Sequence, residues 1–240
     1  MEKIITMQNL YNFAYCNHNI CTKPIKGIVV SFFGLYCCDM YDDSNADGKR
    51  YAKEGILYLV PYQNPWAWMN RQNVDYTDEL LDVLFKEYDL PEDLPVISTG
   101  GSMGGLSALV YMAYAKRTPV ACVANCPVCD MPFHFTERPD LPRTIYSAIY
   151  TYDCTLDEAL RSLSPLHLAD KLPKESKYYI FHCDKDGAVN KEKHSDRLVE
   201  KMKGSHTVEY FAVPGRGHCD LTPEMWEKYH ECAIKSVLEA

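Results

Sequence analysis

Short runs of apolar, β-rich residues alternate along the chain with longer segments whose apolar residues recur at helical spacing. The first clear run, residues 27–33, reads Gly-Ile-Val-Val-Ser-Phe-Phe, and runs of the same kind follow it. Apolar runs of about four to eight residues that lack polar alternation indicate strands buried on both faces of a sheet. The pattern predicts strands at residues 27–33, 56–60, 95–99, 120–124, 177–182 and 207–213.

Helical segments separate these runs. Leu80, Leu84 and Tyr88 lie four residues apart, which is typical of a helix that packs on one face. Thr155 begins a capping-box pattern that ends at a glutamate, and Thr222 precedes a proline that suits a first helical position. We predict helices over residues 44–53, 75–90, 102–116 and 191–202, one that starts after Thr155, and a last one from Thr222 onward.

Strands that alternate with helices are typical of a mostly parallel sheet covered by helices on both faces. Residues 127–174 break this alternation between the fourth and fifth predicted strands, and we expect them to form a short insert, or cap. Residues 1–21 are expected to supply one or two leading strands. The sequence contains no internal repeat and no linker-like stretch, so we expect residues 1–240 to form one α/β domain.

The composition narrows the class of protein. Apolar residues make up 47% of the chain and charged residues 24%, which is ordinary for a folded globular domain. The longest mostly apolar run, residues 27–38, is shorter than the ~20 residues that a membrane span needs. The first residues show no charged segment followed by a long apolar one, so we expect neither a signal peptide nor a membrane partner.

The net charge and the cysteine content indicate which partners are unsuitable and which cellular compartment to expect. Thirty-three acidic residues against 25 basic ones give a net charge of −8, and no dense Lys/Arg block is present. This balance disfavours nucleic acid as a partner. The eleven cysteines are odd in number and show no disulfide framework, so we interpret them as reduced thiols and expect a cytoplasmic protein.

The third predicted strand runs directly into Gly-Gly-Ser-Met-Gly-Gly at residues 100–105, and a helix follows. This is a G-x-S-x-G nucleophile elbow in its strand–turn–helix context, with Ser102 as the exposed residue. Side chains at Gly100 and Gly104 would collide with neighbouring backbone, and the Met103 amide is placed to stabilise an oxyanion. The alternative is a glycine-rich turn with an incidental serine; a P-loop is excluded because no Lys-Ser/Thr pair follows.

A nucleophilic serine needs a base and an orienting acid, and in this topology the chain order is serine, acid, histidine. His218 follows the last predicted strand in a glycine-rich loop, and the acid is expected after the fifth strand. Asp184 and Asp186 both lie there. We favour Asp186, because Gly187 lets the loop turn directly after it and Val189 can anchor the loop by packing.

These motifs together resemble the α/β-hydrolase superfamily, and the chain is most similar to its compact esterase and prolyl-oligopeptidase-like branch. Ser-Pro-Leu at residues 164–166 also resembles that branch, and the resemblance covers residues 27–240. It implies an acyl-enzyme mechanism with Ser102, His218 and Asp186 and no metal or organic cofactor. Many members carry His-Gly before the second oxyanion amide; this chain has Phe-Gly-Leu at 33–35, so the resemblance assigns that amide to Leu35.

Two further features need interpretation. Cys126 and Cys129 form a C-x-x-C that suits a redox pair or half of a zinc site, but no second ligand pair lies at zinc spacing, so we favour a structural role. Aromatic residues crowd residues 64–70 and the insert, and most of them are expected to pack the insert onto the core. We take as candidates for an apolar substrate pocket Trp66, Trp68, Phe133 and Phe135.

Three functions remain open at this stage. A carboxylesterase acting on small or medium esters is favoured. A prolyl-oligopeptidase-like peptidase acting on short peptides is the alternative; peptidases of that branch usually add an N-terminal propeller, for which we expect no room here. A catalytically silent binding protein is disfavoured, because binding alone does not require an intact serine, acid and histidine.

Overall fold

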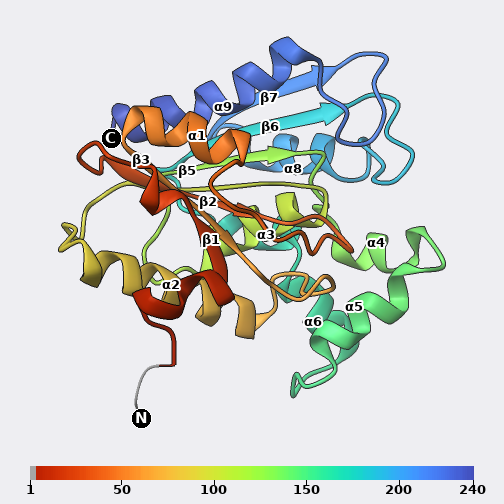
Figure 1. The fold of residues 1–240 in the computed structure, drawn as a ribbon. Helices are drawn as coiled ribbons and strands as arrows, with labels where there is room; N and C mark the ends of the chain where they lie inside the picture. The colour runs from red at the N-terminus through yellow and green to blue at the C-terminus, as the bar shows by residue number, and fades with distance from the viewer. Residues whose placement is uncertain (1–3) are drawn as a thin grey trace.

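The computed structural model describes residues 4–240, which form a seven-stranded sheet in the order β1-β3-β2-β4-β5-β6-β7 (Figure 1). Strands β2 to β7 are parallel, and β1 pairs antiparallel with β3 at one edge. The strands are β1 (Ala14–Cys16), β2 (Gly27–Phe32), β3 (Ile56–Pro61), β4 (Val96–Gly101), β5 (Ala121–Asn125), β6 (Lys177–Cys183) and β7 (Thr207–Val213).

The six expected strands are confirmed, each to within two residues at either end. One leading strand, β1, lies in the N-terminal segment between two short 3-10 helices, η1 (Met7–Asn12) and η2 (Asn17–Asn19). Residues 1–3 of the segment expected to contribute leading strands lie outside the described residues. The mostly parallel sheet with flanking helices confirms the α/β class.

Helices cover both faces of this sheet (Figure 1). One face carries α1 and α9, and the other carries α2, α3 and α8. Two buried apolar clusters lie between the sheet and these layers, which explains why the strands read as nearly continuous apolar runs. The helices are α1 (Ala46–Glu54), α2 (Arg71–Glu87), α3 (Met103–Tyr114), α4 (Met131–Glu137), α5 (Leu141–Ile149), α6 (Leu156–Ser162), α7 (Pro165–Leu168), α8 (Ser195–Met202) and α9 (Pro223–Leu238), with a 3-10 turn, η3 (Ala169–Lys171), after α7.

Local capping sets several helix boundaries. The Thr155 capping box precedes α6, and the Thr222 side chain accepts a hydrogen bond from the Met225 amide at the start of α9, both as expected. The helix predicted over 191–202 is wrong in its first turn, because it begins only at Ser195. The Asn190 side chain accepts a hydrogen bond from the Lys193 amide, and this local turn competes with helix formation there.

Helices α4 to α7 lie between β5 and β6 in sequence, and α4 and α5 project beyond the carboxyl ends of the strands (Figure 1). The Ser164 hydroxyl ties this segment together: it donates to the Cys129 carbonyl and accepts from the Met131 amide. That residues 127–174 act as a cap within a single domain stays a prediction.

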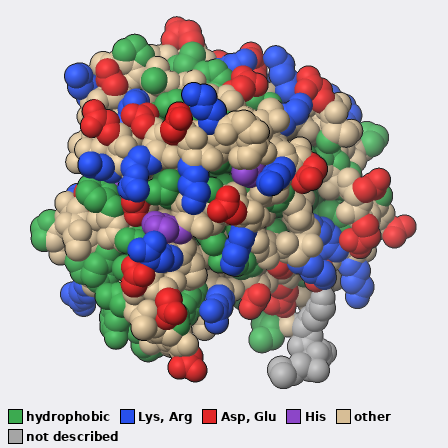
Figure 2. Space-filling view, turned by 180° about the vertical axis from the view of Figure 1, so that it is seen from behind, with side chains coloured by type: hydrophobic (Ala, Val, Ile, Leu, Met, Phe, Trp, Pro, Cys, Tyr) green, Lys and Arg blue, Asp and Glu red, His purple; other side chains and the backbone are tan. Residues whose placement is uncertain are grey.

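The molecular surface carries charged side chains of both signs, as the sequence composition leads us to expect. Basic and acidic side chains intermingle over the face seen from behind (Figure 2). Among residues 4–240, no helix combines the length and the apolar character that crossing a bilayer would require.

Candidate active site

Ser102 occupies the sharp turn between β4 and α3. Its backbone adopts φ 59° and ψ −123°, a region that residues other than glycine rarely enter, and its amide donates to the Asn125 carbonyl at 2.9 Å. A Cβ added to Gly100 would lie 2.4 Å from the Gly104 carbonyl carbon, and one added to Gly104 would lie 2.1 Å from the Phe32 oxygen. The strained turn therefore depends on glycine at both positions.

A continuous hydrogen-bonded chain links three side chains from three loops. The His218 ring lies with Nε2 2.9 Å from Ser102 Oγ and Nδ1 2.7 Å from Asp186 Oδ2. Asp184, the other acid considered, instead accepts a hydrogen bond from the Gly215 amide at 2.6 Å and is exposed. The structure thus brings Ser102, His218 and Asp186 together and leaves Asp184 outside the chain.

The Asp186 carboxylate is fully buried, and several hydrogen-bond donors contact it. Its Oδ1 accepts from the amides of Ala188 and Val189 at 2.8 and 2.9 Å, and its Oδ2 lies 3.3 Å from His182 Nε2. Burial alone would raise the pKa of Asp186, but the hydrogen bonds from His182, His218 and Val189 outweigh burial and hold that pKa well below its usual range. Asp186 is therefore an anion.

An anionic Asp186 fixes the tautomer of His218. Since a carboxylate only accepts hydrogen bonds, Nδ1 of His218 carries the proton and Nε2 is free to accept the Ser102 hydroxyl. Burial opposes charging of the ring, but the hydrogen bond to Asp186, with a further contribution from Cys126, raises the pKa of His218 to about 9. The pair can take up a proton from Ser102 and stabilise it.

Two backbone amides border the space in front of Ser102. A Cβ on Gly34 would lie 3.9 Å from the Ser102 Cβ, so the segment after β2 runs beside the nucleophile. Among residues 4–240, no acceptor receives a hydrogen bond from the amide of Leu35 or of Met103. Both amides, which we expected to hold the oxyanion, are therefore available to a ligand.

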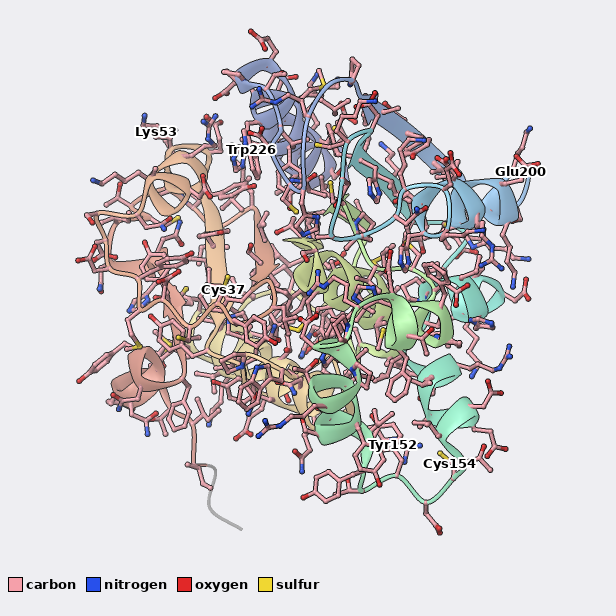
Figure 3. The ribbon with its side chains drawn as sticks, turned by 90° about the vertical axis from the view of Figure 1, so that its right-hand side faces the viewer. Cys37, Lys53, Tyr152, Cys154, Glu200 and Trp226 are labelled. Atoms are coloured by element: carbon pink, nitrogen blue, oxygen red, sulfur yellow. The ribbon has the colours of Figure 1, made fainter. Side chains whose placement is uncertain are left out.

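A cavity of about 520 Å³ opens in front of Ser102 and His218. Trp68 lines it, whereas Trp66 lines a separate neighbouring cavity, and Phe133 and Phe135 are not among the lining residues of either. Residues from well-separated segments meet at its wall: Cys37 follows β2, and Trp226 lies on α9 (Figure 3).

The wall that α4 contributes is polar, which the sequence reasoning missed. His134 and Arg138 line the cavity, while Phe133 packs with its ring centroid 5.6 Å from that of His194. His134 lies on α4, whereas Arg138 follows the helix as its C-cap residue with an extended backbone. Because Arg138 lies outside the helix, helical spacing in the sequence could not have selected these two lining residues together.

Within residues 4–240, three groups of side chains have ligand atoms close enough to hold a metal ion: Cys126–His218–Cys219, Cys126–His182–Asp186 and His134–Glu137–His194. The last is disfavoured. His194 Nδ1 accepts from the amides of Cys129 and Asp130, both at 3.0 Å, so its Nε2 carries the proton that it donates to Glu137. A protonated nitrogen offers no lone pair to a metal.

The second group is disfavoured for a similar reason. His182 Nε2 lies 3.1 Å from the Val189 carbonyl oxygen and 3.3 Å from the Asp186 carboxylate. Because both of those oxygens only accept, this nitrogen also carries a proton. Of the three groups, Cys126–His218–Cys219 is the one whose histidine keeps an unprotonated nitrogen, Nε2 of His218, which accepts from Ser102.

Comparisons with known proteins bear on the family and the fold of this chain. A model of the prolyl oligopeptidase family matches residues 67–232. No curated protein matches the sequence. Among solved structures, a puromycin hydrolase superposes with a TM-score of 0.72 at 16% identity, over 91% of this chain and 34% of that one, so the chain spans about a third of its length.

Two similar structures have nearly the same length as this chain. An S-formylglutathione hydrolase from Agrobacterium tumefaciens superposes with a TM-score of 0.67 at 15% identity, over 94% of this chain and 88% of that one. Esterase B from Lactobacillus rhamnosis superposes with a TM-score of 0.69 at 14% identity, over 91% and 79%. At these identities the likeness shows the fold, which is that of the α/β-hydrolases.

Proposed function

The chain belongs to the prolyl oligopeptidase family and is a serine hydrolase, and from this premise we propose that it cleaves carboxylic esters with Ser102, His218 and Asp186. The observation that carries the proposal is the hydrogen-bonded chain at the cavity mouth. Its two links, 2.9 Å from Ser102 to His218 and 2.7 Å from His218 to Asp186, are within the reach that proton transfer needs.

The proposed reaction follows from the positions of these groups. Ser102 Oγ attacks the ester carbonyl carbon while His218 Nε2 takes its proton, and the anionic Asp186 stabilises the imidazolium that forms. The amides of Leu35 and Met103 donate to the carbonyl oxygen as it becomes an anion. His218 then protonates the departing alcohol, and water activated by the same ring releases the acid from Ser102.

Two observations favour an ester over a peptide as substrate. The similar structures that match this chain over most of both lengths include an S-formylglutathione hydrolase and an esterase. Aromatic side chains such as Trp68 and Tyr41 form part of the cavity wall, which suits a small or medium apolar acyl group. No metal or organic cofactor is part of the proposed reaction.

A peptidase is the second candidate, and family membership favours it. The puromycin hydrolase and a puromycin-hydrolysing peptidase from Mycobacterium tuberculosis share the fold over 91% and 90% of this chain. A panel of p-nitrophenyl esters measured beside Pro-p-nitroanilides separates the two. We expect kcat/KM to be at least ~10²-fold higher for the best ester; a higher value for an anilide would assign the chain to the peptidases.

The role of Ser102 is tested by Ser102→Ala. This variant is expected to fold, to lose fluorophosphonate labelling and to retain only the residual rate that binding and the oxyanion donors supply. Ser107→Ala is the matched control, because Ser107 lies on the same helix but donates to the Met103 carbonyl, away from His218. Ester hydrolysis at the wild-type rate by folded Ser102→Ala protein would refute the proposal.

A further inference from the structure

Two thiols lie against the ring nitrogen that faces the nucleophile. Cys219 Sγ is 3.8 Å from His218 Nε2, and the ligand atoms of Cys126, His218 and Cys219 all lie within 4.8 Å of one another. Zinc binds thiolate sulfur at about 2.3 Å and imidazole nitrogen at about 2.0–2.1 Å, so its tetrahedral ligands stand about 3.4–3.8 Å apart. The three atoms therefore nearly have the spacing of a zinc site already.

Two backbone amides contact one of these sulfurs. Cys126 Sγ accepts hydrogen bonds from the amides of Cys183 and Cys219, both at 3.4 Å. The hydrogen bond with Cys219 and burial raise the pKa of the Cys126 thiol, and the amide of Cys183 offsets them only in part, so a metal ion must displace the thiol proton. Cys126 and Cys219 also have positive φ values of 44° and 55°, and such strain persists only where the surrounding structure enforces it.

The histidine is already oriented as a ligand. Asp186 accepts the Nδ1 proton of His218, which leaves the Nε2 lone pair directed at Ser102 and at the sulfurs. Carboxylate–histidine pairs of this kind orient metal-binding imidazoles and make them more basic. The same arrangement that prepares His218 as a base prepares it as a metal ligand.

Access is through the substrate cavity. Cys219 is half-buried and lines the cavity together with His218 and Ser102, while Cys126 is fully buried beneath it. An ion entering from the cavity would meet His218 and Cys219 first and would keep its fourth position toward solvent.

We propose that Cys126, Cys219 and His218 form a zinc site that reversibly switches the hydrolase off. Binding replaces two thiol protons, so one Zn²⁺ and two thiols give a neutral Zn(thiolate)₂ group and two protons in solution. The ion takes the Nε2 lone pair that would accept the Ser102 proton, and the serine loses its base. The metal is thus an inhibitor of the proposed reaction and no part of it.

Inhibition tests the site in the full chain, kept reduced with a phosphine. Zn²⁺ is expected to abolish ester hydrolysis with one ion per chain, and a chelator is expected to restore the rate. Mg²⁺ at the same concentration is expected to leave the rate unchanged, since it prefers oxygen ligands. Loss of one ligand in Cys219→Ala or Cys126→Ala is expected to raise the half-inhibiting zinc concentration at least ~10-fold, each variant being compared with its own metal-free rate.

Two matched controls ask whether any thiol would serve. Cys37 lines the same cavity but is not in the ligand group, and Cys154 is exposed in the loop between α5 and α6, at the bottom of the view in Figure 3. Cys37→Ala and Cys154→Ala are expected to keep the wild-type zinc sensitivity. Equal sensitivity of the wild type, Cys219→Ala and Cys126→Ala would overturn the proposal. If Cys126→Ala does not fold, the zinc sensitivity of Cys219→Ala, a change at a half-buried position, decides the test.

Cobalt binding separates this proposal from the proposed function. Co²⁺ is expected to give thiolate-to-metal charge-transfer absorption and tetrahedral d–d bands with the Ser102→Ala variant, which performs no hydrolysis. The charge-transfer band is expected to weaken in the Ser102→Ala, Cys219→Ala double variant. No charge-transfer band in folded Ser102→Ala protein would overturn the zinc site whether or not the wild type hydrolyses esters.

Discussion

Two buried carboxylates in this molecule, Asp186 and Glu137, each contact two histidine rings, yet only one of these networks reaches a nucleophile. Asp186 Oδ2 lies 2.7 Å from His218 Nδ1 and 3.3 Å from His182 Nε2. The second nitrogen of His218 is left free to accept a hydrogen bond from Ser102 at the cavity mouth. The Asp186 network is therefore open at one end.

The Glu137 network has no free acceptor on its His194 side. Glu137 Oε2 lies 2.6 Å from His134 Nδ1 and 3.0 Å from His194 Nε2. The remaining nitrogen of His194 accepts two backbone amides from Cys129 and Asp130 and has nothing left to accept. This network ties α4 to the loop before α8 and offers no base through His194.

Both networks have the features by which a catalytic site is often sought. Each carboxylate is largely buried, and hydrogen bonds from histidines hold the pKa of Asp186 and of Glu137 well below the usual range despite burial. The difference lies in which ring nitrogen remains an acceptor. A perturbed pKa therefore locates a network, and the free lone pair beside Ser102 shows which network can do chemistry.

Asp186→Asn should break the open network with the largest effect. The amides of Ala188 and Val189 require an oxygen at the Oδ1 position, so the asparagine NH₂ must face His218. That ring then carries its proton on Nε2, where it can no longer accept from Ser102. We expect kcat to fall ~10⁴-fold, as it does for the equivalent change in chymotrypsin.

Steady-state kinetics on a p-nitrophenyl ester measure this loss, with circular dichroism to establish that the variant folds. A fall of less than ~10-fold in folded protein would remove Asp186 from the proposed reaction.

Glu137→Gln should break the Glu137 network and cost stability instead of catalysis. The two ring N–H groups of His134 and His194 lose their shared anionic acceptor, which we expect to lower the free energy of unfolding by about 2–4 kcal/mol. Urea denaturation measures this change, and kcat of the folded variant should fall less than ~10-fold. A catalytic loss as large as that of Asp186→Asn would show that both networks take part in the reaction.

The pH profile sharpens the comparison. Only neutral His218 can accept the Ser102 proton, so kcat/KM should rise with pH through the pKa of that ring and then level off. Because the hydrogen bond to Asp186 raises this pKa, the midpoint should lie above the ~6.5 of an unperturbed histidine. Initial rates across a pH series give the midpoint, and one at or below ~6.5 would contradict the assigned hydrogen bond.

Asp184→Asn should have the smallest effect and serves as the control for the acid. Asp184 is exposed and accepts one hydrogen bond from the Gly215 amide, which the asparagine oxygen can also accept. We expect kcat/KM to stay within about twofold of the wild type. A larger loss here than in Asp186→Asn would move the acid to Asp184.

The sequence by itself determined the features that rest on neighbouring residues. Apolar runs predicted the central strands because parallel strands are buried on both faces, and Thr222 predicted the start of α9 because capping acts within one turn. The elbow at Ser102 could be predicted for the same reason, because contacts within the strand–turn–helix unit require its glycines.

Only the tertiary structure decided features that depend on which loops meet. Asp184 and Asp186 stand two residues apart in the same loop, and their roles differ because one side chain turns toward His218 and the other toward Gly215. Likewise, His134 lines the cavity and the neighbouring Phe133 and Phe135 do not. The direction in which α4 packs decides this.

The thiols beside the histidine illustrate the same limit. Cys126 follows β5, and His218 and Cys219 follow β7. Their spacing along the chain therefore does not predict that their sulfur and nitrogen atoms lie close together. They come together because parallel strands deliver all their carboxyl ends to one edge of the sheet. The sequence determines which side chains are present, but the packing of the sheet edge determines the distances that bring them together into a site.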